Sequence, residues 1–250
     1  MRSWHHGEVT AADPFDPMCP CSSGRALRAC CSPIGSGEFD DAAVHAVLTA
    51  LRAFGARDEF AAAMRRNGAA LVVPLPEDAQ ARLLACCEDD FRLMVVQMLY
   101  TVLPVRGDAS LAAMLLRRGA PGLTPNARAL LAQMAAFPPS LYEVCEVTPG
   151  QSLRLRDRMR SGDVLIAERS TSWQARPGHL VLARVRTRAD GTPVFEPPVL
   201  PLLDRESVER LLAAHGAERA MRVDAQHRLL LGLCLLWQAT AAAASADEVW

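Results

Sequence analysis

The feature that most constrains the fold is a group of four cysteines in the string CPCSSGRALRACC, which runs from Cys19 to Cys31. Pro20 favours a tight turn between the first two cysteines, and Ser23-Gly24 lets the chain reverse. One helical turn over residues 25–29 would then return the last two cysteines to the first pair. Four thiolates in a tetrahedral array, each about 2.3 Å from the ion, make a closed structural zinc site. The spacing therefore predicts a Zn2+ site whose ligands are Cys19, Cys21, Cys30 and Cys31.

Redox disulfides or free thiols are the alternative use of these cysteines. The adjacent Cys30 and Cys31 cannot easily join each other, and the first residues contain no secretory signal, so clustered thiols favour a metal. Arg25 and Arg28 add positive charge beside the thiolates and help to keep them ionised. Because protein sulfur would fill all four positions, no water could bind, and zinc catalysis is not expected.

The string CPCSSGRALRACC resembles the SEC-C motif, a small zinc-binding module at the C-terminus of the preprotein-translocase ATPase SecA. That pattern reads Cys-Pro-Cys-Gly-Ser-Gly, then a basic stretch with an aromatic residue, then Cys-Cys or Cys-His. The resemblance places the four cysteines on ligand positions and implies zinc binding. Ser22 stands where the family usually has glycine, Leu27 replaces the aromatic residue, and Arg25 and Arg28 replace lysines. Residues 141–200 are also similar to a segment of uncharacterised bacterial SEC-C proteins.

All 27 basic residues are arginine, and no lysine occurs in the chain. This excludes Schiff-base catalysis and the phosphate-binding loop that ends in Gly-Lys-Ser/Thr, so the ATPase activity of SecA does not carry over. A GC-rich codon bias also explains the missing lysine. The chain has no nucleophile elbow and no paired-histidine zinc motif, and we expect a protein that is not an enzyme.

Hydrophobic periodicity divides the chain into four segments. We expect an α+β fold that is mainly helical, with a small antiparallel β-sheet or partial barrel before C-terminal helices. The segments are a zinc knuckle over 1–37, a helical domain over 38–140, a small antiparallel β domain over 141–202 and C-terminal helices over 203–250. Helices are predicted over 42–54, 59–66, 77–103, 110–118, 125–137, 204–215 and 220–246. Five short strands are predicted within 141–202.

Arginines alternate along two of the predicted strands, at 154, 156 and 158 and at 184, 186 and 188. Alternate residues of a strand share a face, so we expect Arg154, Arg156, Arg158, Arg184 and Arg186 to be exposed together. The favoured interpretation is the solvated side of a half-buried sheet, since the pI of the chain is only about 6.6. The alternative is a basic face for nucleic acid, on which Trp173 could stack a base.

These patterns favour a non-enzymatic protein-interaction or adaptor module. In this interpretation the zinc knuckle presents Arg25, Leu27 and Arg28 to a protein partner, while nucleic acid is the alternative partner. The most apolar stretch, Leu229–Trp237, is too short to span a bilayer, so we expect a cytoplasmic protein without a membrane span. That stretch predicts a buried helix, or one covered by the second chain of a homodimer.

Overall fold

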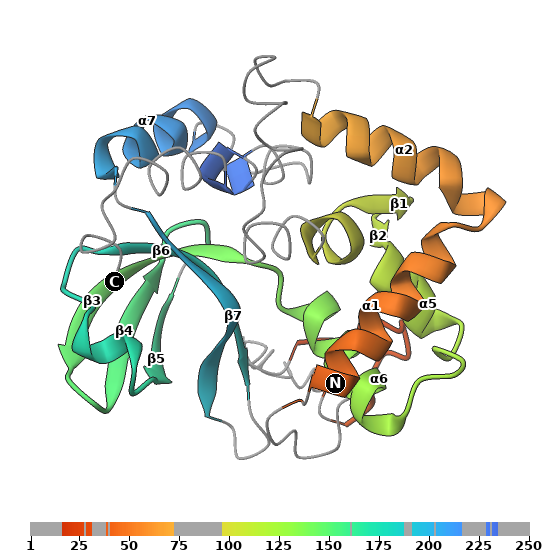
Figure 1. The fold of residues 1–250 in the computed structure, drawn as a ribbon, viewed down its shortest axis with the longest axis horizontal. Helices are drawn as coiled ribbons and strands as arrows, with labels where there is room; N and C mark the ends of the chain where they lie inside the picture. Colours follow the sequence, from red (N-terminus) through yellow and green to blue (C-terminus); the bar gives the residue numbers. More distant parts are fainter. Residues whose placement is uncertain are drawn as a thin grey trace, which may run out of the picture.

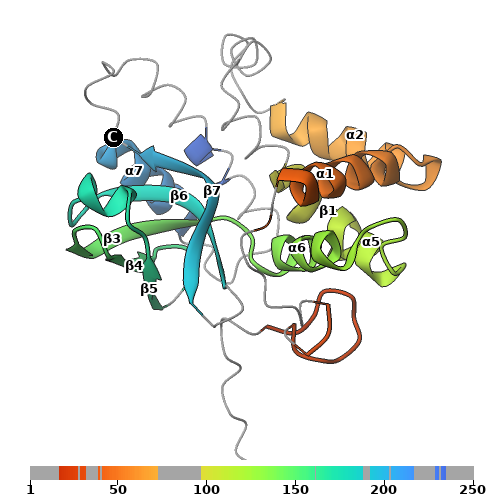
Figure 2. The same ribbon diagram turned by 60° about the horizontal axis from the view of Figure 1, so that its bottom comes forward.

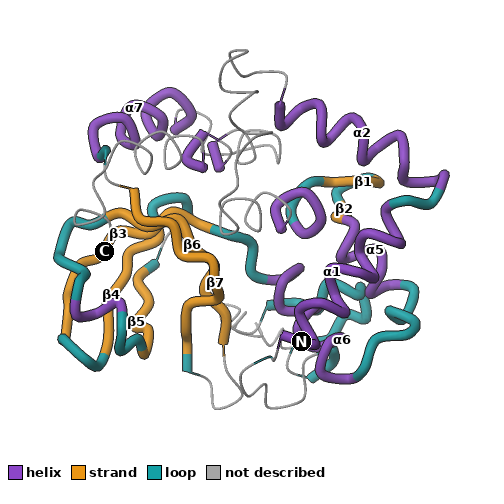
Figure 3. Tube along the Cα trace, viewed as in Figure 1, coloured by secondary structure: helices purple, strands orange, loops and turns teal. Residues whose placement is uncertain are grey.

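The computed structural model places the helices of residues 41–72 and 111–136 on one side of the molecule and the five-stranded sheet, with one helix packed on it, on the other (Figure 1; Figure 3). It is a mixed α+β structure, as predicted. The predicted helices over 77–103 and 220–246 lie largely outside the described residues, as does Arg28. The described residues are 17–27, 29–31, 39, 41–72, 97–160, 162–187, 192–202, 204–216, 229–230 and 232–234.

The helical side contains four helices that pack around one apolar core. Two of them begin where the sequence predicts. The Ser110 hydroxyl accepts a hydrogen bond from the Ala113 amide at 3.3 Å, and the Thr124 hydroxyl accepts one from Ala127 at 3.2 Å. Such caps satisfy amide groups that a helix leaves free in its first turn. The helices are α1 (Asp41–Gly55), α2 (Asp58–Val72), α5 (Leu111–Arg117) and α6 (Pro125–Ala136).

The predicted end of the second helix at Asn67-Gly68 is wrong, because α2 continues to Val72. A tertiary contact accounts for the difference: the Asn67 side chain donates a hydrogen bond to the Pro104 carbonyl at 3.0 Å. Pro104 belongs to a short hairpin of β1 (Pro104–Arg106) and β2 (Ala109–Ser110), which no sequence pattern predicted. Gly107 forms its turn with φ of +57°, a conformation that glycine adopts without strain.

The sheet is antiparallel and has the strand order β5-β4-β3-β6-β7. The first three strands form a meander, and the fourth returns to pair with the first, which is a Greek key. β5 and β7, at the two edges, also lie against each other, so the sheet curls into a partly open barrel. The strands are β3 (Ser140–Thr148), β4 (Ser152–Asp157), β5 (Asp163–Ala167), β6 (Leu180–Thr187) and β7 (Pro193–Leu202).

Side chains from all five strands fill the barrel interior. Alternation along each strand sends every second residue inward, and these residues form one buried cluster. The predicted small antiparallel sheet is therefore present and closes on itself as a partial barrel. The cluster comprises Tyr142, Val144, Leu153, Leu155, Val164, Ile166, Ala175, Val181, Ala183, Val185 and Phe195.

One half of the outer wall of the barrel is covered by helix. Outward leucines of β3, β6 and β7 pack with α7 (Arg205–Gly216) and with Leu229, Leu230, Leu233 and Cys234. These four residues are buried within this chain, so they do not provide the exposed surface on which the homodimer prediction rested. Among the described residues, no helix has the length and apolar character needed to cross a membrane.

Ion pairs among four charged side chains connect α7 to the barrel. The Arg158 guanidinium donates to Glu143 at 2.8 Å and to Glu209 at 3.1 Å, and Arg205 donates to Glu143 at 2.9 Å. Burial alone would raise the pKa of Glu143, but the guanidinium groups of Arg205 and Arg158 outweigh burial and lower this pKa. The ionised carboxylate therefore stabilises the folded state.

We expect Glu143→Gln to lower the free energy of unfolding by about 1 kcal/mol at neutral pH. Because the pKa of Glu143 is lowered in the folded state, its contribution is complete above the unfolded value of about 4.3 and is lost as the pH falls through the folded value. Urea titrations between neutral and acidic pH should show a smaller acid-induced loss of stability in the variant. An unchanged pH dependence would contradict the assignment.

Candidate metal centre

The loop over residues 17–31 consists of successive turns, each of which is closed by a backbone hydrogen bond. The Ser22 amide donates to the Cys19 carbonyl at 3.1 Å, closing a turn in which Pro20 takes the second position. The Cys19 amide donates to the Arg25 carbonyl at 2.9 Å and ties the two sides of the loop together. The expected helical turn before Cys30 is instead a pair of tight turns, in which the Ala29 and Cys30 amides bond to carbonyls three residues earlier.

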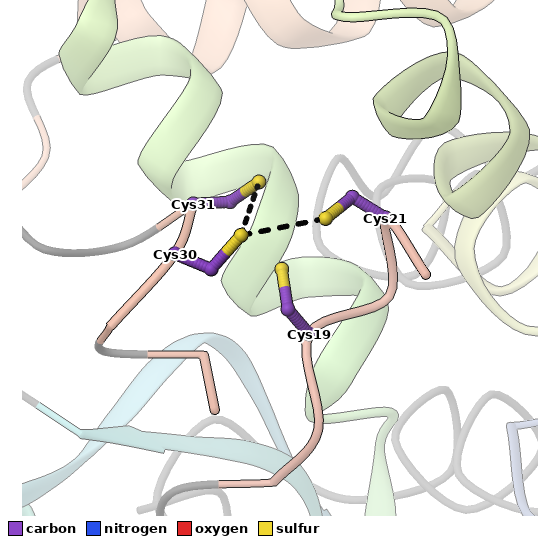
Figure 4. Close-up of side chains that lie close together, drawn as sticks. All are labelled: Cys19, Cys21, Cys30 and Cys31. Carbon is purple, nitrogen blue, oxygen red and sulfur yellow. Dashed lines mark hydrogen bonds between the residues drawn. The ribbon is translucent and has the colours of Figure 1, made fainter. Parts of the chain in front are cut away.

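These turns bring the four predicted ligands together. The sulfur atoms of Cys19, Cys21, Cys30 and Cys31 all lie within 4.8 Å of one another (Figure 4). The Sγ atoms of Cys21 and Cys30 are 3.5 Å apart, and those of Cys30 and Cys31 are 3.9 Å apart. A tetrahedral ion at the usual Zn–S distance would separate its sulfur ligands by about 3.8 Å. The described cluster can therefore hold a metal ion with little rearrangement.

The four thiols divide into an inner pair and an outer pair. Cys19 and Cys31 are each only 5% exposed, and burial raises the pKa of both thiols. Burial alone would also raise the pKa of Cys21, but hydrogen bonds to Ser23 and Cys19 lower it to about 6. The Ser23 hydroxyl, 3.1 Å from the Cys30 sulfur, lowers the pKa of Cys30, and Arg25 assists at 3.4 Å. The outer pair is therefore the more easily ionised.

The loop shares its core with the helices. Cys19, Leu27 and Cys31 belong to the same buried cluster as residues of α1 and α6, and Figure 2 shows the loop beneath α6. Arg128 of α6 donates to the Cys31 sulfur at 3.7 Å. No sequence signal identified Arg128, because it lies 97 residues from Cys31 in the chain. The cysteine cluster is therefore attached to the helical core as well as to its own loop.

The prediction that the Leu27 side chain is presented to a partner is wrong, because this side chain is buried. This side chain is 2% exposed and packs into the helical core, where an apolar residue is more stable than in water. Arg25 is exposed, as predicted, whereas Arg28 lies outside the described residues. The exposed part of the loop consists of Met18, Arg25, Ala29 and residues 22–24.

Ser22 adopts a left-handed conformation with φ of +65°. Such a conformation costs a non-glycine residue roughly 1–2 kcal/mol, so glycine would be the less strained residue at this position. Gly24, with φ of +73°, occupies the second left-handed position of the loop. The loop therefore keeps the conformation of a glycine-containing turn although a serine occupies one of its two special positions.

The five predicted basic residues of the sheet do not form one exposed face. Arg184 is 0% exposed and Arg186 is 7% exposed, because other segments of the chain cover the outer side of β6. Arg184 donates to the Thr101 hydroxyl at 3.1 Å, and Arg186 lies 5.0 Å from the centre of the Phe39 ring. Both lie about 4 Å from Glu196 of β7, so the prediction that they are exposed is wrong.

The other three arginines meet carboxylates from neighbouring strands and from α7. Arg154 pairs with Glu146 at 3.0 Å and Arg156 pairs with Asp163 at 3.3 Å, both at the surface. Arg158 is half-buried between Glu143 and Glu209, as described above. Counting charges along the sequence missed these pairs, because strand pairing places Glu143 and Glu146 of β3 beside arginines of β4.

Comparison of the chain with protein-family models, curated proteins and solved structures finds no match.

Proposed function

We propose that the protein binds one structural Zn2+ through Cys19, Cys21, Cys30 and Cys31 and acts as a non-enzymatic protein-interaction module. The observation that carries the proposal is the convergence of four sulfur atoms within 4.8 Å. A donor set of four thiolates suits zinc, whereas magnesium and calcium prefer oxygen ligands. With zinc bound, all four coordination positions are occupied by protein, so the ion has a structural role.

The position of the loop supports a role for the metal in fixing the conformation of the exposed side of the loop. The inner cysteines and Leu27 are buried against α1 and α6, while Met18 and Arg25 face outward. Met18 is 61% exposed, so its apolar side chain is accessible to a partner. Zinc would fix the turns that carry these two residues, and we propose this exposed rim of the loop as the contact surface for a protein partner.

Native mass spectrometry of the purified protein tests the metal. We expect the mass of the chain plus one zinc ion, and loss of that ion in Cys30→Ser. Cys145→Ser is the matched control, since Cys145 is a half-buried cysteine of β3 outside the cluster, and it should keep the metal. An apoprotein mass for the wild type would exclude the zinc site. If partner capture is equal for wild type, Cys30→Ser and Arg25→Ala, the interaction surface is not on this loop.

A further inference from the structure

We propose that the uncovered half of the barrel wall, together with Trp173, binds single-stranded nucleic acid. This half is the open face, defined by Ser152, Arg154 and Arg156 of β4 and by Asp163, Leu165 and Ala167 of β5. The proposal does not depend on the zinc site, which lies in a different segment of the chain.

The open face is the part of the barrel that no helix of the described chain covers. The inward residues of β4 and β5 are buried, whereas the outward residues of β5 are all exposed. Leu165 is 53% exposed and lies directly opposite Arg154 in the strand pairing. In five-stranded, partly open Greek-key barrels that bind oligonucleotides, the second and third strands carry the ligand, and here these strands are β4 and β5.

Trp173 lies at one end of the open face, and its ring packs against the turn at Gly150. It belongs to a short 3-10 helix (Thr171–Trp173) between β5 and β6 and is 72% exposed. One side of its ring lies on Gly150, in the turn that leads into β4, where a Cβ would come within 2.8 Å of the indole. With 72% of the residue exposed, most of the ring is accessible to solvent. A base can therefore stack on this ring, as bases do on aromatic side chains of single-strand binding proteins.

Hydrogen bonds within the loop over residues 168–173 fix the backbone that carries the exposed Trp173. The buried Ser172 hydroxyl accepts from the Gly150 amide at 2.9 Å and donates to the Arg169 carbonyl at 2.8 Å. The Glu168 carboxylate accepts from the amides of Ser170 and Thr171. The loop therefore holds a large apolar ring in water, which costs hydrophobic free energy unless a ligand covers it.

The charges around the ring favour a phosphate backbone. Arg169 and Arg176 are exposed on the same loop, and within the described part of the chain neither has a carboxylate within ion-pair distance. Of the nearby acids, Glu168 is engaged with backbone amides, while Glu146 and Asp163 form exposed pairs with Arg154 and Arg156. Exposed pairs are weak, so a phosphate oxygen can replace the carboxylate on these arginines.

The arrangement favours nucleic acid over a protein partner. A protein interface needs a buried apolar centre, but the exposed Leu165 of this face lies directly opposite Arg154 and two positions from Asp163. Single aromatic platforms interleaved with arginine are instead typical of single-strand binding sites, where bases stack and phosphates meet guanidinium groups. Duplex DNA would bind less well, because its bases are already stacked and paired.

Fluorescence anisotropy with labelled oligothymidine and oligouridine strands of about 12 nucleotides tests the proposal on the full-length protein. We expect dissociation constants of about 1–100 µM at low salt. Trp173→Ala should weaken binding about tenfold, whereas Trp173→Phe, which keeps a stacking ring, should remain within about threefold. The logarithm of the binding constant falls linearly with the logarithm of the salt concentration. The double variant Arg169→Ala/Arg176→Ala should make this slope less steep by about 0.7 for each phosphate that the protein no longer neutralises.

Met18→Ala is the matched control, because Met18 is also a strongly exposed apolar side chain but lies on the cysteine loop, outside the open face. It should leave oligonucleotide affinity unchanged. Absence of binding by the wild type at about 100 µM protein, an equal loss of affinity in Met18→Ala, or equal affinity for a duplex of the same length would overturn the proposal. So would self-association that sedimentation shows to depend on Trp173, since the occupant would then be a second copy of the chain.

Discussion

Cys31→Ser should abolish stoichiometric zinc binding and lower the melting temperature of the whole helical side of the protein. Cys31 is buried in the core that joins the loop to α1 and α6, and Arg128 of α6 contacts its sulfur. Binding of a structural metal contributes directly to folding free energy, and we expect a loss of about 3 kcal/mol. For a chain of this size, that corresponds to a decrease of about 6–12 °C.

Differential scanning calorimetry of the wild type, of Cys31→Ser and of the chelated wild type measures this effect. The chelated wild type should melt close to the variant, because both lack the ion. Cys145→Ser again serves as the control and should shift the melting temperature much less, since its thiol is outside the cluster. If chelation leaves the melting curve unchanged, the loop does not stabilise the helical core.

Glu196→Gln should be the most destabilising single change in the barrel. Glu196 lies beside two buried guanidinium groups, with Arg184 at 4.0 Å and Arg186 at 3.9 Å. Burial raises the pKa of Glu196 and lowers the pKa of Arg184, so each group depends on the other to remain charged. Removing one partner of such a group leaves uncompensated buried charge, which costs about 3–5 kcal/mol.

Urea unfolding at neutral pH provides the measurement. Glu146→Gln is the matched control, because it removes the exposed partner of Arg154 and should cost less than about 1 kcal/mol. The double variant Glu196→Gln/Arg184→Met should be more stable than Glu196→Gln alone, since it also removes the buried guanidinium of Arg184 that has lost its carboxylate. Similar unfolding midpoints for Glu196→Gln and Glu146→Gln would show that the buried pairs do not stabilise the fold.

Strand and helix positions were largely predictable because they depend on short-range patterns. Alternation predicted all five strands of the barrel, and the break at Gly107 and the proline at position 125 predicted where two helices begin. The end of α2 was not predictable from Asn67-Gly68, since the carbonyl that Asn67 binds lies 37 residues further along the chain. The β1–β2 hairpin was missed because its two strands are too short to show a period.

The sequence by itself determined the cluster of four cysteines, because a few turns bring them together and proline, glycine and serine control the conformations of these turns locally. Only the tertiary structure decided which arginines face water. Arg154 and Arg184 occupy equivalent positions in two alternating strands, yet the first is at the surface and the second is buried beside Thr101, 83 residues away. Alternation fixes which residues share a face, but the layer packed on that face decides its exposure, and that layer comes from distant segments.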